Sequence, residues 1–207
     1  MSVHIGIDFD NTIARYDELF HQCALDRGLI PPRTPKSKAA VRAHLWTQPD
    51  GNTPWTELQG IVYGERMKEA PPCPGSLDFF AFCRDSGLRV SIVSHKIEFP
   101  ALGPQVNMRE AASTWIKEHG LYSDELGHVY FESSRQAKIE RIADLGCTHF
   151  IDDLAEVFSD PCFPDNVEKI LYAREAHADS LEDQVVRAFS DWPAIIHYFD
   201  GILKSGS

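Results

Sequence analysis

The stretch that decides the fold lies near the start of the chain and reads VHIGIDFDNTIARYD, residues 3–17. Its first part, residues 3–7, is largely apolar and rich in β-branched side chains, which predicts a buried strand. Asp8 and Asp10 follow this strand two residues apart. Two carboxylates so close together repel each other, and burying either one costs free energy. A positively charged group elsewhere in the chain, or a bound cation, must offset this repulsion and this cost.

The composition is that of an ordinary globular protein. The chain has 207 residues, of which 43% are hydrophobic and 25% charged, enough for one core or a core plus a small module. No run reaches the roughly 18 apolar residues of a membrane helix, and no secretory signal is evident at the N-terminus. The five cysteines are scattered without a C-x-x-C pair, which argues against a zinc site or a disulfide framework. We expect a cytoplasmic protein with reduced thiols and no membrane partner.

The charge balance is acidic, with a formal net charge of −11 when His is neutral. This argues against binding to nucleic-acid backbones, which requires a basic surface. The same balance fits a cluster of carboxylates that holds a cation.

The first third of the chain is predicted to be helical after its initial strand. Apolar residues recur at helical spacing in three segments, and Thr53 is expected as the N-cap of the last one. Two Pro-rich breaks, IPPRTP and APPCPG, interrupt this region. The predicted helices are 16–28, 37–46 and 53–68. This block contains no predicted strand, and we interpret residues 15–74 as a helical cap inserted into a core domain of residues 1–14 and 75–207.

The rest of the chain alternates between helices and strands. The predicted helices are 76–85, 109–119, 134–145 and 181–198, and the strands are 89–93, 128–131, 148–151 and 169–172. Such alternation predicts an α/β fold, a three-layer α/β/α Rossmann-like core around a parallel sheet, with the small helical cap as its addition. Ligands bind beyond the carboxyl ends of the strands in such sheets, so the residues that follow each strand are the informative ones.

Carboxylates follow two of these strands, Asp8 and Asp10 after the first and Asp152 and Asp153 after 148–151. Converging carboxylates suit a hard cation, and Mg²⁺ is the commonest such ion near phosphates. The ion would supply the positive charge that keeps buried carboxylates ionised. No His or Cys joins the group at metal-ligand spacing, so zinc is a poor candidate.

This arrangement also suits phosphoryl transfer. A carboxylate beside the ion can attack phosphorus, and a second one can act as acid and base. Ser94, after the strand RVSIVS, and Lys138 could donate hydrogen bonds to the transferring oxygens.

Together these segments resemble the four motifs of the haloacid dehalogenase superfamily of phosphotransferases. The first motif, a strand followed by D-x-D-x-[TV], is matched by Asp8-Phe9-Asp10-Asn11-Thr12. An apolar strand that ends in Ser or Thr is matched by VSIVS, which ends at Ser94. The third motif is a Lys near a helix start, matched by Lys138, and the fourth an apolar strand with an acidic pair, matched by THFIDD. All four occur in order, and the helical insertion falls where this family places a small cap.

The resemblance implies a role for each acidic residue. In the family the first Asp attacks phosphorus, and the second protonates the leaving group and later activates water; these are Asp8 and Asp10 here. Mg²⁺ is held by the first Asp side chain, the backbone carbonyl of the second and an Asp of the fourth motif. Related members carry Gly-Asp where this chain has Asp152-Asp153, so Asp153 is expected as the direct ligand and Asp152 as a residue that orients the site.

The expected phosphate-binding residues are Asn11, Thr12, Ser94, His95 and Lys138. Asn11 stands where many members have Gly, and Asn tolerates the unusual backbone angles of that turn. A single Lys on an amphipathic helix is usually solvated, but the spacing of Lys138, fourteen residues ahead of Asp152, favours a place in the site. His95 and Lys96 follow Ser94 directly, and they either contact the substrate phosphate or balance the charge of the carboxylates.

The predicted function is that of a Mg²⁺-dependent phosphatase, a phosphoric monoester hydrolase that acts on a sugar phosphate or a nucleotide through an aspartyl-phosphate intermediate. Asp10 favours this branch, because dehalogenase members lack the acid and transport ATPases carry a Thr in its place. Two alternatives remain: a phosphotransferase or phosphomutase with the same chemistry, and a catalytically silent binding protein with this fold. The expected partner is a small phosphorylated molecule.

Overall fold

The structure is a computed structural model that describes residues 3–121, 128–173 and 186–205. The chain divides into two compact units, and each is described by itself. The first comprises Met1–Ile13, Pro72–His95 and Gly120–Ser207, and the second comprises Ala14–Pro71 and Lys96–His119. The division predicted from the sequence, a cap of 15–74 on a core of 1–14 and 75–207, stays a prediction, and the compact units differ from it in the place of Lys96–His119.

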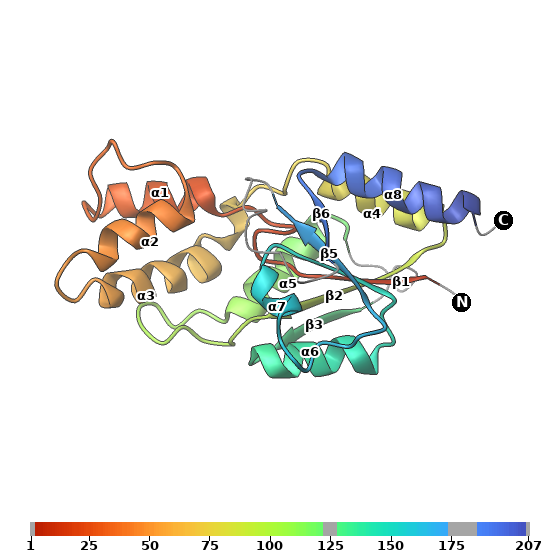
Figure 1. Cartoon of the computed structure of the whole chain (residues 1–207). Coiled ribbons are helices and arrows are strands. Elements are labelled where there is room, and N and C mark those ends of the chain that lie inside the picture. The colour runs from red at the N-terminus through yellow and green to blue at the C-terminus, as the bar shows by residue number, and fades with distance from the viewer. Residues whose placement is uncertain (1–2, 122–127, 174–185, 206–207) are drawn as a thin grey trace. The chain divides into compact units, whose positions relative to one another are not determined.

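The first unit is built on a parallel sheet of six strands in the order β3-β2-β1-β4-β5-β6 (Figure 1). All neighbouring strands run parallel. The strands are β1 (His4–Ile7), β2 (Arg89–His95), β3 (Val129–Glu132), β4 (His149–Asp152), β5 (Glu168–Tyr172) and β6 (Val186–Phe189). From β1 the chain first moves toward one edge of the sheet and then, with β4, toward the other. Ligand sites of such sheets lie at the point where this direction reverses, which here is between β1 and β4.

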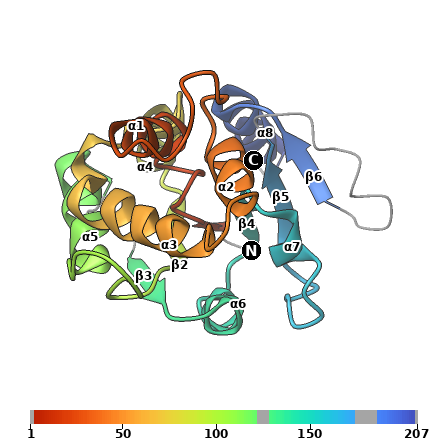
Figure 2. The same cartoon turned by 90° about the vertical axis from the view of Figure 1, so that its left-hand side faces the viewer.

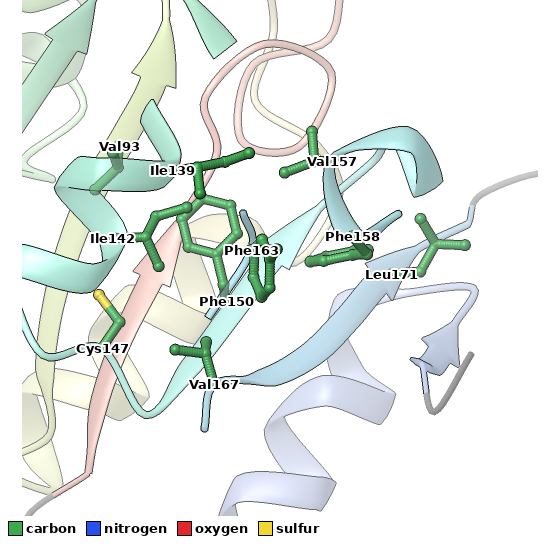
Figure 3. Packing of buried hydrophobic residues seen from close by; sticks show 10 residues of the cluster. All are labelled: Val93, Ile139, Ile142, Cys147, Phe150, Val157, Phe158, Phe163, Val167 and Leu171. Carbon is green, nitrogen blue, oxygen red and sulfur yellow. The ribbon is translucent and has the colours of Figure 1, made fainter. Parts of the chain in front are cut away.

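One face of this sheet is covered by α6 (Arg135–Asp144) and α7 (Ala155–Phe158). Figure 3 shows Ile139 and Ile142 of α6 beside Phe150 of β4, and Phe163 between Phe150 and Phe158 of α7. These side chains and their neighbours are almost fully buried, so they form one continuous apolar core.

The opposite face is covered by α4 (Ser76–Asp85) and α8 (Trp192–Ser205), which lie side by side (Figure 1). The ring of Phe79 lies 4.8 Å from that of Trp192 and 5.7 Å from that of Phe199. Phe199 also packs at 5.1 Å against His149, the neighbour of Phe150 in β4. Since successive strand residues point to opposite faces, these contacts place one helical layer on each side of the sheet. The predicted three-layer α/β/α fold is therefore confirmed.

The second unit is helical, as the sequence predicts for residues 15–74. Figure 2 shows its helices α1 (Asp17–Asp26), α2 (Lys38–Trp46) and α3 (Asn52–Gly60), which contact one another. Its elements are α1 (Asp17–Asp26), α2 (Lys38–Trp46), α3 (Asn52–Gly60), the π-helical turn η1 (Ile61–Glu65), the 3-10 turn η2 (Met67–Glu69) and α5 (Met108–Glu118). Aromatic rings fill its interior: Phe20 stacks on Trp55 at 5.0 Å, and Tyr63 meets Tyr16 edge-on at 4.9 Å.

Most predicted elements are confirmed, but two predictions are wrong. The helix expected to begin after Thr53 begins at Asn52, and its N-cap is Gly51. The helix expected over 181–198 is in part a strand, because Val186–Phe189 pairs with β5 and α8 begins only at Trp192. Pairing to a sheet edge is a long-range contact that local helix propensity does not reveal. Residues 181–185 of this prediction lie outside the described residues. Within the described ranges, no helix is long and apolar enough to cross a membrane.

The first strand contains a buried histidine that couples stability to pH. The Nδ1 of His4 lies 3.0 Å from the carbonyl oxygen of Leu145, and its Nε2 lies 2.9 Å from the Oγ of Ser91. Burial lowers the pKa of His4 from its usual 6.5, and the charge of Arg89 lowers it further. Burial also lowers the pKa of His149. Both groups therefore favour the neutral ring in the folded protein.

We expect the contribution of His4 to the free energy of unfolding to fall as the pH drops from 7.5 to 5.5, whereas Asp152, whose pKa is raised to about 6, contributes in the opposite direction. Because the pKa of His4 is lower in the folded than in the unfolded chain, the unfolded chain binds more protons below pH 6.5, and stability present above that pH is lost. One such group contributes at most about 1.4 kcal/mol per pH unit. Urea unfolding at both pH values should therefore show that, on this drop in pH, the free energy of unfolding of His4→Asn falls less, or rises more, than that of the wild type. The control His197→Asn, at an exposed position of α8, should behave like the wild type. An unchanged pH dependence in His4→Asn would contradict this account.

Candidate active site

The candidate site lies at the carboxyl ends of the adjacent strands β1 and β4. Asp8 follows β1 directly, Asp152 ends β4, and Asp153 comes next. The pairing continues past Ile7, because the backbone N–H of Asp8 donates to the carbonyl of Ile151 at 2.8 Å. As a result, one carboxylate oxygen from each of the three aspartates lies within 4.8 Å of the others. The predicted convergence of carboxylates at this edge of the sheet is present.

Lys138 supplies a positive charge to this cluster. Its Nζ donates to Asp8 Oδ1 and to Asp152 Oδ2, both at 2.6 Å, and its side chain is 4% exposed. Lys138 lies in the first turns of α6, where the Oγ of Ser134 caps the helix by accepting a hydrogen bond from the backbone of Ala137. The amphipathic-helix Lys is therefore a buried partner of the carboxylates and not a solvated surface residue.

Burial and charge determine the protonation of these groups. Burial disfavours the ammonium of Lys138, but Asp152 and Asp8 outweigh it and raise the pKa of Lys138 above its ordinary value. Burial raises the pKa of Asp152 to about 6, with Lys138 opposing and the charge of Asp8 adding to the effect. Lys138 thus keeps its proton. The ionised form of Asp152 is costly in this buried place, and a second cation nearby would lower that cost.

A second donor, besides Lys138, holds Asp8. The Oγ of Ser94, from β2, donates to Asp8 Oδ1 at 3.0 Å, so this oxygen accepts two hydrogen bonds. Thr12 Oγ1 lies 3.5 Å from Asp8 Oδ2 and 3.5 Å from Asp153 Oδ1, at the long limit of a hydrogen bond. The side chain of Asp8 is therefore held through Oδ1, and Oδ2 is in the weaker contact.

The two aspartates after β4 differ in their surroundings. Asp152 is fully buried, and its oxygens accept from Lys138 Nζ and, at 3.0 Å, from the backbone N–H of Leu154. Asp153 is half-buried and lies beside Thr12. These contacts support the expectation that Asp152 orients the site and Asp153 is the direct ligand of an ion.

The loop after β1 is fixed by unusual backbone geometry and by long-range contacts. Asn11 has φ = 63°, in the left-handed region that Gly favours and Asn tolerates, as expected from the sequence. The indole N–H of Trp192 in α8 donates to the carbonyl of Thr12 at 3.2 Å, and the backbone N–H of Cys73 donates to that of Ile13 at 2.7 Å. The sequence around Trp192 carries no signal of this contact.

Asp10 and His95 complete the predicted set. Burial lowers the pKa of His95, the charge of Lys138 lowers it further, and the charges of Asp8 and Asp10 oppose this. The charges of both carboxylates therefore act on the same imidazole. The phosphate-binding roles of Asn11, Thr12, Ser94, His95 and Lys138 stay predictions, although the contacts above bring Thr12, Ser94 and Lys138 directly to the carboxylates.

The cluster suits a hard divalent cation. Its donors are carboxylate oxygens, which Mg²⁺ prefers. With all groups ionised, the three aspartates and Lys138 carry a formal charge of −2, which a divalent ion would balance. The residues present therefore fit the predicted Mg²⁺, with Asp8 and Asp153 as the side chains best placed to hold it.

Comparisons with known proteins identify the architecture. Neither a scan against protein-family models nor a search of curated proteins finds a match. Solved structures do match: a HAD-superfamily hydrolase from Ehrlichia chaffeensis aligns over 98% of this chain and 99% of its own, with 14% identity and a TM-score of 0.55. The chain has the fold of haloacid dehalogenase (HAD) superfamily hydrolases.

Two further solved structures share this fold. The putative HAD-hydrolase YfnB from Bacillus subtilis, solved bound to magnesium, aligns over 97% of this chain and 99% of its own, with 10% identity and a TM-score of 0.64. An L-2-haloacid dehalogenase from Xanthobacter autotrophicus, with chloropropionic acid covalently bound, aligns over 98% and 100%, with 12% identity and a TM-score of 0.52. At these identities the likeness concerns the fold alone.

Lys138→Met should lower the free energy of unfolding by about 3 kcal/mol or more, because it leaves the buried carboxylates of Asp8 and Asp152 without their cation. Urea unfolding at pH 7.5 without Mg²⁺ measures this. The double variant Lys138→Met/Asp152→Asn should recover part of the loss, since one buried charge is then removed.

The matched control is Lys204→Met, which breaks an ion pair with Asp200 in which the Lys side chain is 75% exposed. Its effect should stay within about 1 kcal/mol, as for other exposed pairs. Equal stabilities of Lys138→Met and Lys204→Met would show that the buried contact does not stabilise the first unit.

Proposed function

We propose that this protein is a Mg²⁺-dependent phosphatase of the HAD superfamily, which hydrolyses a small phosphate monoester through an aspartyl-phosphate intermediate. The observation that carries the proposal is the oriented carboxylate of Asp8, held by Lys138 and Ser94, with a second carboxylate, Asp10, two residues further on. This supplies a nucleophile, donors for phosphoryl oxygens and an acid–base group at one end of the sheet.

The first half of the proposed reaction transfers the phosphoryl group to the protein. A carboxylate oxygen of Asp8 attacks phosphorus, the bond from phosphorus to the ester oxygen breaks, and Asp10 gives its proton to the departing alkoxide. Lys138 and Ser94 donate hydrogen bonds, and donors fixed before the reaction stabilise the charge that develops on the transferring oxygens. The products of this half are an alcohol and an aspartyl phosphate at Asp8.

The second half releases the phosphate. Asp10, now ionised, takes a proton from water, the resulting hydroxide attacks phosphorus, and the bond between phosphorus and the Asp8 oxygen breaks. Inorganic phosphate leaves, and both aspartates return to their starting protonation states. Asp10 thus serves as acid in one half and as base in the other, which requires a side chain that can reach both the leaving group and water.

Magnesium would be held by Asp8 and Asp153, with the backbone carbonyl of Asp10 as a further ligand implied by the resemblance. When bound, it offsets the negative charge of the carboxylates and of the substrate phosphate. The carboxylate cluster and the magnesium-bound YfnB structure support this assignment.

Dehalogenation is the competing reaction, because dehalogenases share this fold. An alkoxide is a strong base and leaves far more easily when an acid protonates it, whereas a halide leaves without a proton. The first step of a phosphatase therefore gains from Asp10, whereas the first step of a dehalogenase needs no acid. This supports phosphate ester hydrolysis over attack on a halogenated acid.

Two alternative functions would use the same site. A phosphotransferase or phosphomutase would pass the phosphoryl group from Asp8 to a second alcohol in place of water. A silent binding protein would keep the fold without turnover, but the contacts of Asp8 with Lys138 and Ser94 favour a working site.

The test is phosphate release from a panel of sugar phosphates, nucleotides and p-nitrophenyl phosphate, with 2-chloropropanoate as the dehalogenase substrate. We expect phosphate release that EDTA abolishes and added Mg²⁺ restores, and no chloride release. Asp8→Asn should lose all turnover, while Asp10→Asn should lower kcat by about 10²–10⁴-fold, the usual contribution of a general acid–base group.

The matched control is Asp160→Asn, which removes a half-buried carboxylate of the same unit that is not among the three clustered aspartates and should leave turnover unchanged. A wild type as inactive as Asp8→Asn on every phosphate ester would overturn the phosphatase. Phosphate that appears on an added sugar and not in water would instead identify a phosphotransferase.

A further inference from the structure

The turn after β1 places one threonine beside the two aspartates proposed to hold the ion. Thr12 is fully buried, and its Oγ1 lies 3.5 Å from Asp8 Oδ2 and 3.5 Å from Asp153 Oδ1. The turn closes on itself, because the backbone N–H of Ile13 donates to the carbonyl of Phe9 at 3.0 Å. The position of the Thr12 hydroxyl relative to both carboxylates therefore depends on how the backbone of this turn is held.

Three successive carbonyl groups of this turn accept hydrogen bonds from other segments of the first unit. The Sγ of Cys73 donates to the carbonyl of Asn11 at 3.5 Å, and the backbone N–H of Cys73 donates to that of Ile13 at 2.7 Å. The carbonyl between them, that of Thr12, accepts from the indole N–H of Trp192 at 3.2 Å. Cys73 thus holds both ends of this backbone segment, and Trp192 holds its middle.

Trp192 is itself firmly placed. It is the first residue of α8, and Asp191 Oδ1 accepts from the backbone N–H of Ala194 at 2.9 Å, a contact typical of a helix N-cap. The side chain of Trp192 is fully buried, with its ring 4.8 Å from that of Phe79 in α4 and 5.4 Å from that of Tyr172 in β5. The direction of its N–H is therefore fixed by packing.

Gly75 lets the start of α8 approach the segment that carries Cys73. A Cβ at Gly75 would lie 3.0 Å from the Cβ of Trp192 and 3.2 Å from Pro193 Cδ. Its φ of 84° also lies in the left-handed region that Gly favours. Cys73 and Trp192, which hold the turn after β1, thus belong to two segments that pack directly on each other.

We propose that Trp192 is a positioning residue for the ion site, which acts through the carbonyl of Thr12 and keeps Asp8 and Asp153 selective for Mg²⁺ over Ca²⁺. The inference rests on the proposed function, which assigns Mg²⁺ to these two aspartates. Mg²⁺ requires near-ideal octahedral geometry, whereas Ca²⁺ accepts a variable number of oxygen ligands in flexible arrangements. Carboxylates that are free to shift therefore lose affinity for Mg²⁺ more than for Ca²⁺.

The test measures the dissociation constants of Mg²⁺ and Ca²⁺ by calorimetry on the substrate-free protein, for the wild type and for Trp192→Phe. Phe has no N–H, so the carbonyl of Thr12 loses its indole donor and the turn loses its middle contact. We expect the affinity for Mg²⁺ to fall by about 10–100-fold, the usual effect of removing a group that orients a metal ligand. The affinity for Ca²⁺ should fall less.

Two further side chains at position 192 separate the loss of the donor from the loss of packing. 3-Benzothienylalanine carries sulfur in place of the indole N–H and fills nearly the same space, so it should lower Mg²⁺ affinity as Trp192→Phe does. 4-Fluorotryptophan keeps the N–H and should bind Mg²⁺ like the wild type.

The matched control is Trp115→Phe in the second unit. Trp115 is 1% exposed, and its indole N–H donates to the carbonyl of Ala70 at 2.8 Å, so the control also removes a buried indole donor. Urea unfolding without ions should show lower stability for Trp115→Phe and Trp192→Phe alike, because each leaves a buried carbonyl without its donor. Both dissociation constants of Trp115→Phe should equal those of the wild type.

The outcomes are distinct from those of the phosphatase test. Wild-type affinity for Mg²⁺ in the benzothienylalanine variant, equal losses for Mg²⁺ and Ca²⁺, or the same loss in Trp115→Phe would overturn the positioning role, and so would a wild type that binds no Mg²⁺. If the wild type hydrolyses no phosphate ester but binds Mg²⁺ with the expected dependence on Trp192, the proposed phosphatase fails and the positioning role stands.

Discussion

The ammonium group of Lys138, buried between the carboxylates of Asp8 and Asp152, is the contact on which the rest of the site depends. Without it, two acids at the ends of neighbouring strands would face each other in a region that excludes water, at a large cost in free energy. With it, one oxygen of Asp8 and one oxygen of Asp152 are held by the same ammonium group. The same contact joins α6 to the two central strands.

Much of this site could be predicted from the sequence because it depends on spacing along single elements. In a parallel sheet, residues that follow neighbouring strands meet at one edge, so DFD after one strand and DD after another predict the carboxylate cluster. The left-handed turn at Asn11 follows from the residue type at a position where related proteins carry Gly. Lys138 could be assigned only through its distance from Asp152 in the chain.

The remaining features arise from contacts between distant segments, which a single sequence does not encode locally. Trp192 holds the carbonyl of Thr12 from 180 residues away, and Val186–Phe189 becomes a strand because β5 offers it an edge. Tyr63 has the helical spacing of a core residue, and only the fold shows that Lys38 and Lys96 approach its ring. The local sequence pattern thus predicts which polar side chains follow the strands, whereas tertiary packing determines which other residues surround them.

The central claim is that Asp8 forms a covalent bond to phosphorus. The most direct measurement is to quench the protein with acid during turnover of a phosphate ester, reduce it with borohydride, and map the modified residue by mass spectrometry. An acyl phosphate at Asp8 would be reduced to homoserine, and the account predicts this change at position 8 alone, dependent on Mg²⁺ and absent from Asp8→Asn. Turnover without this product, or with the change at Asp10, Asp152 or Asp153, would contradict it.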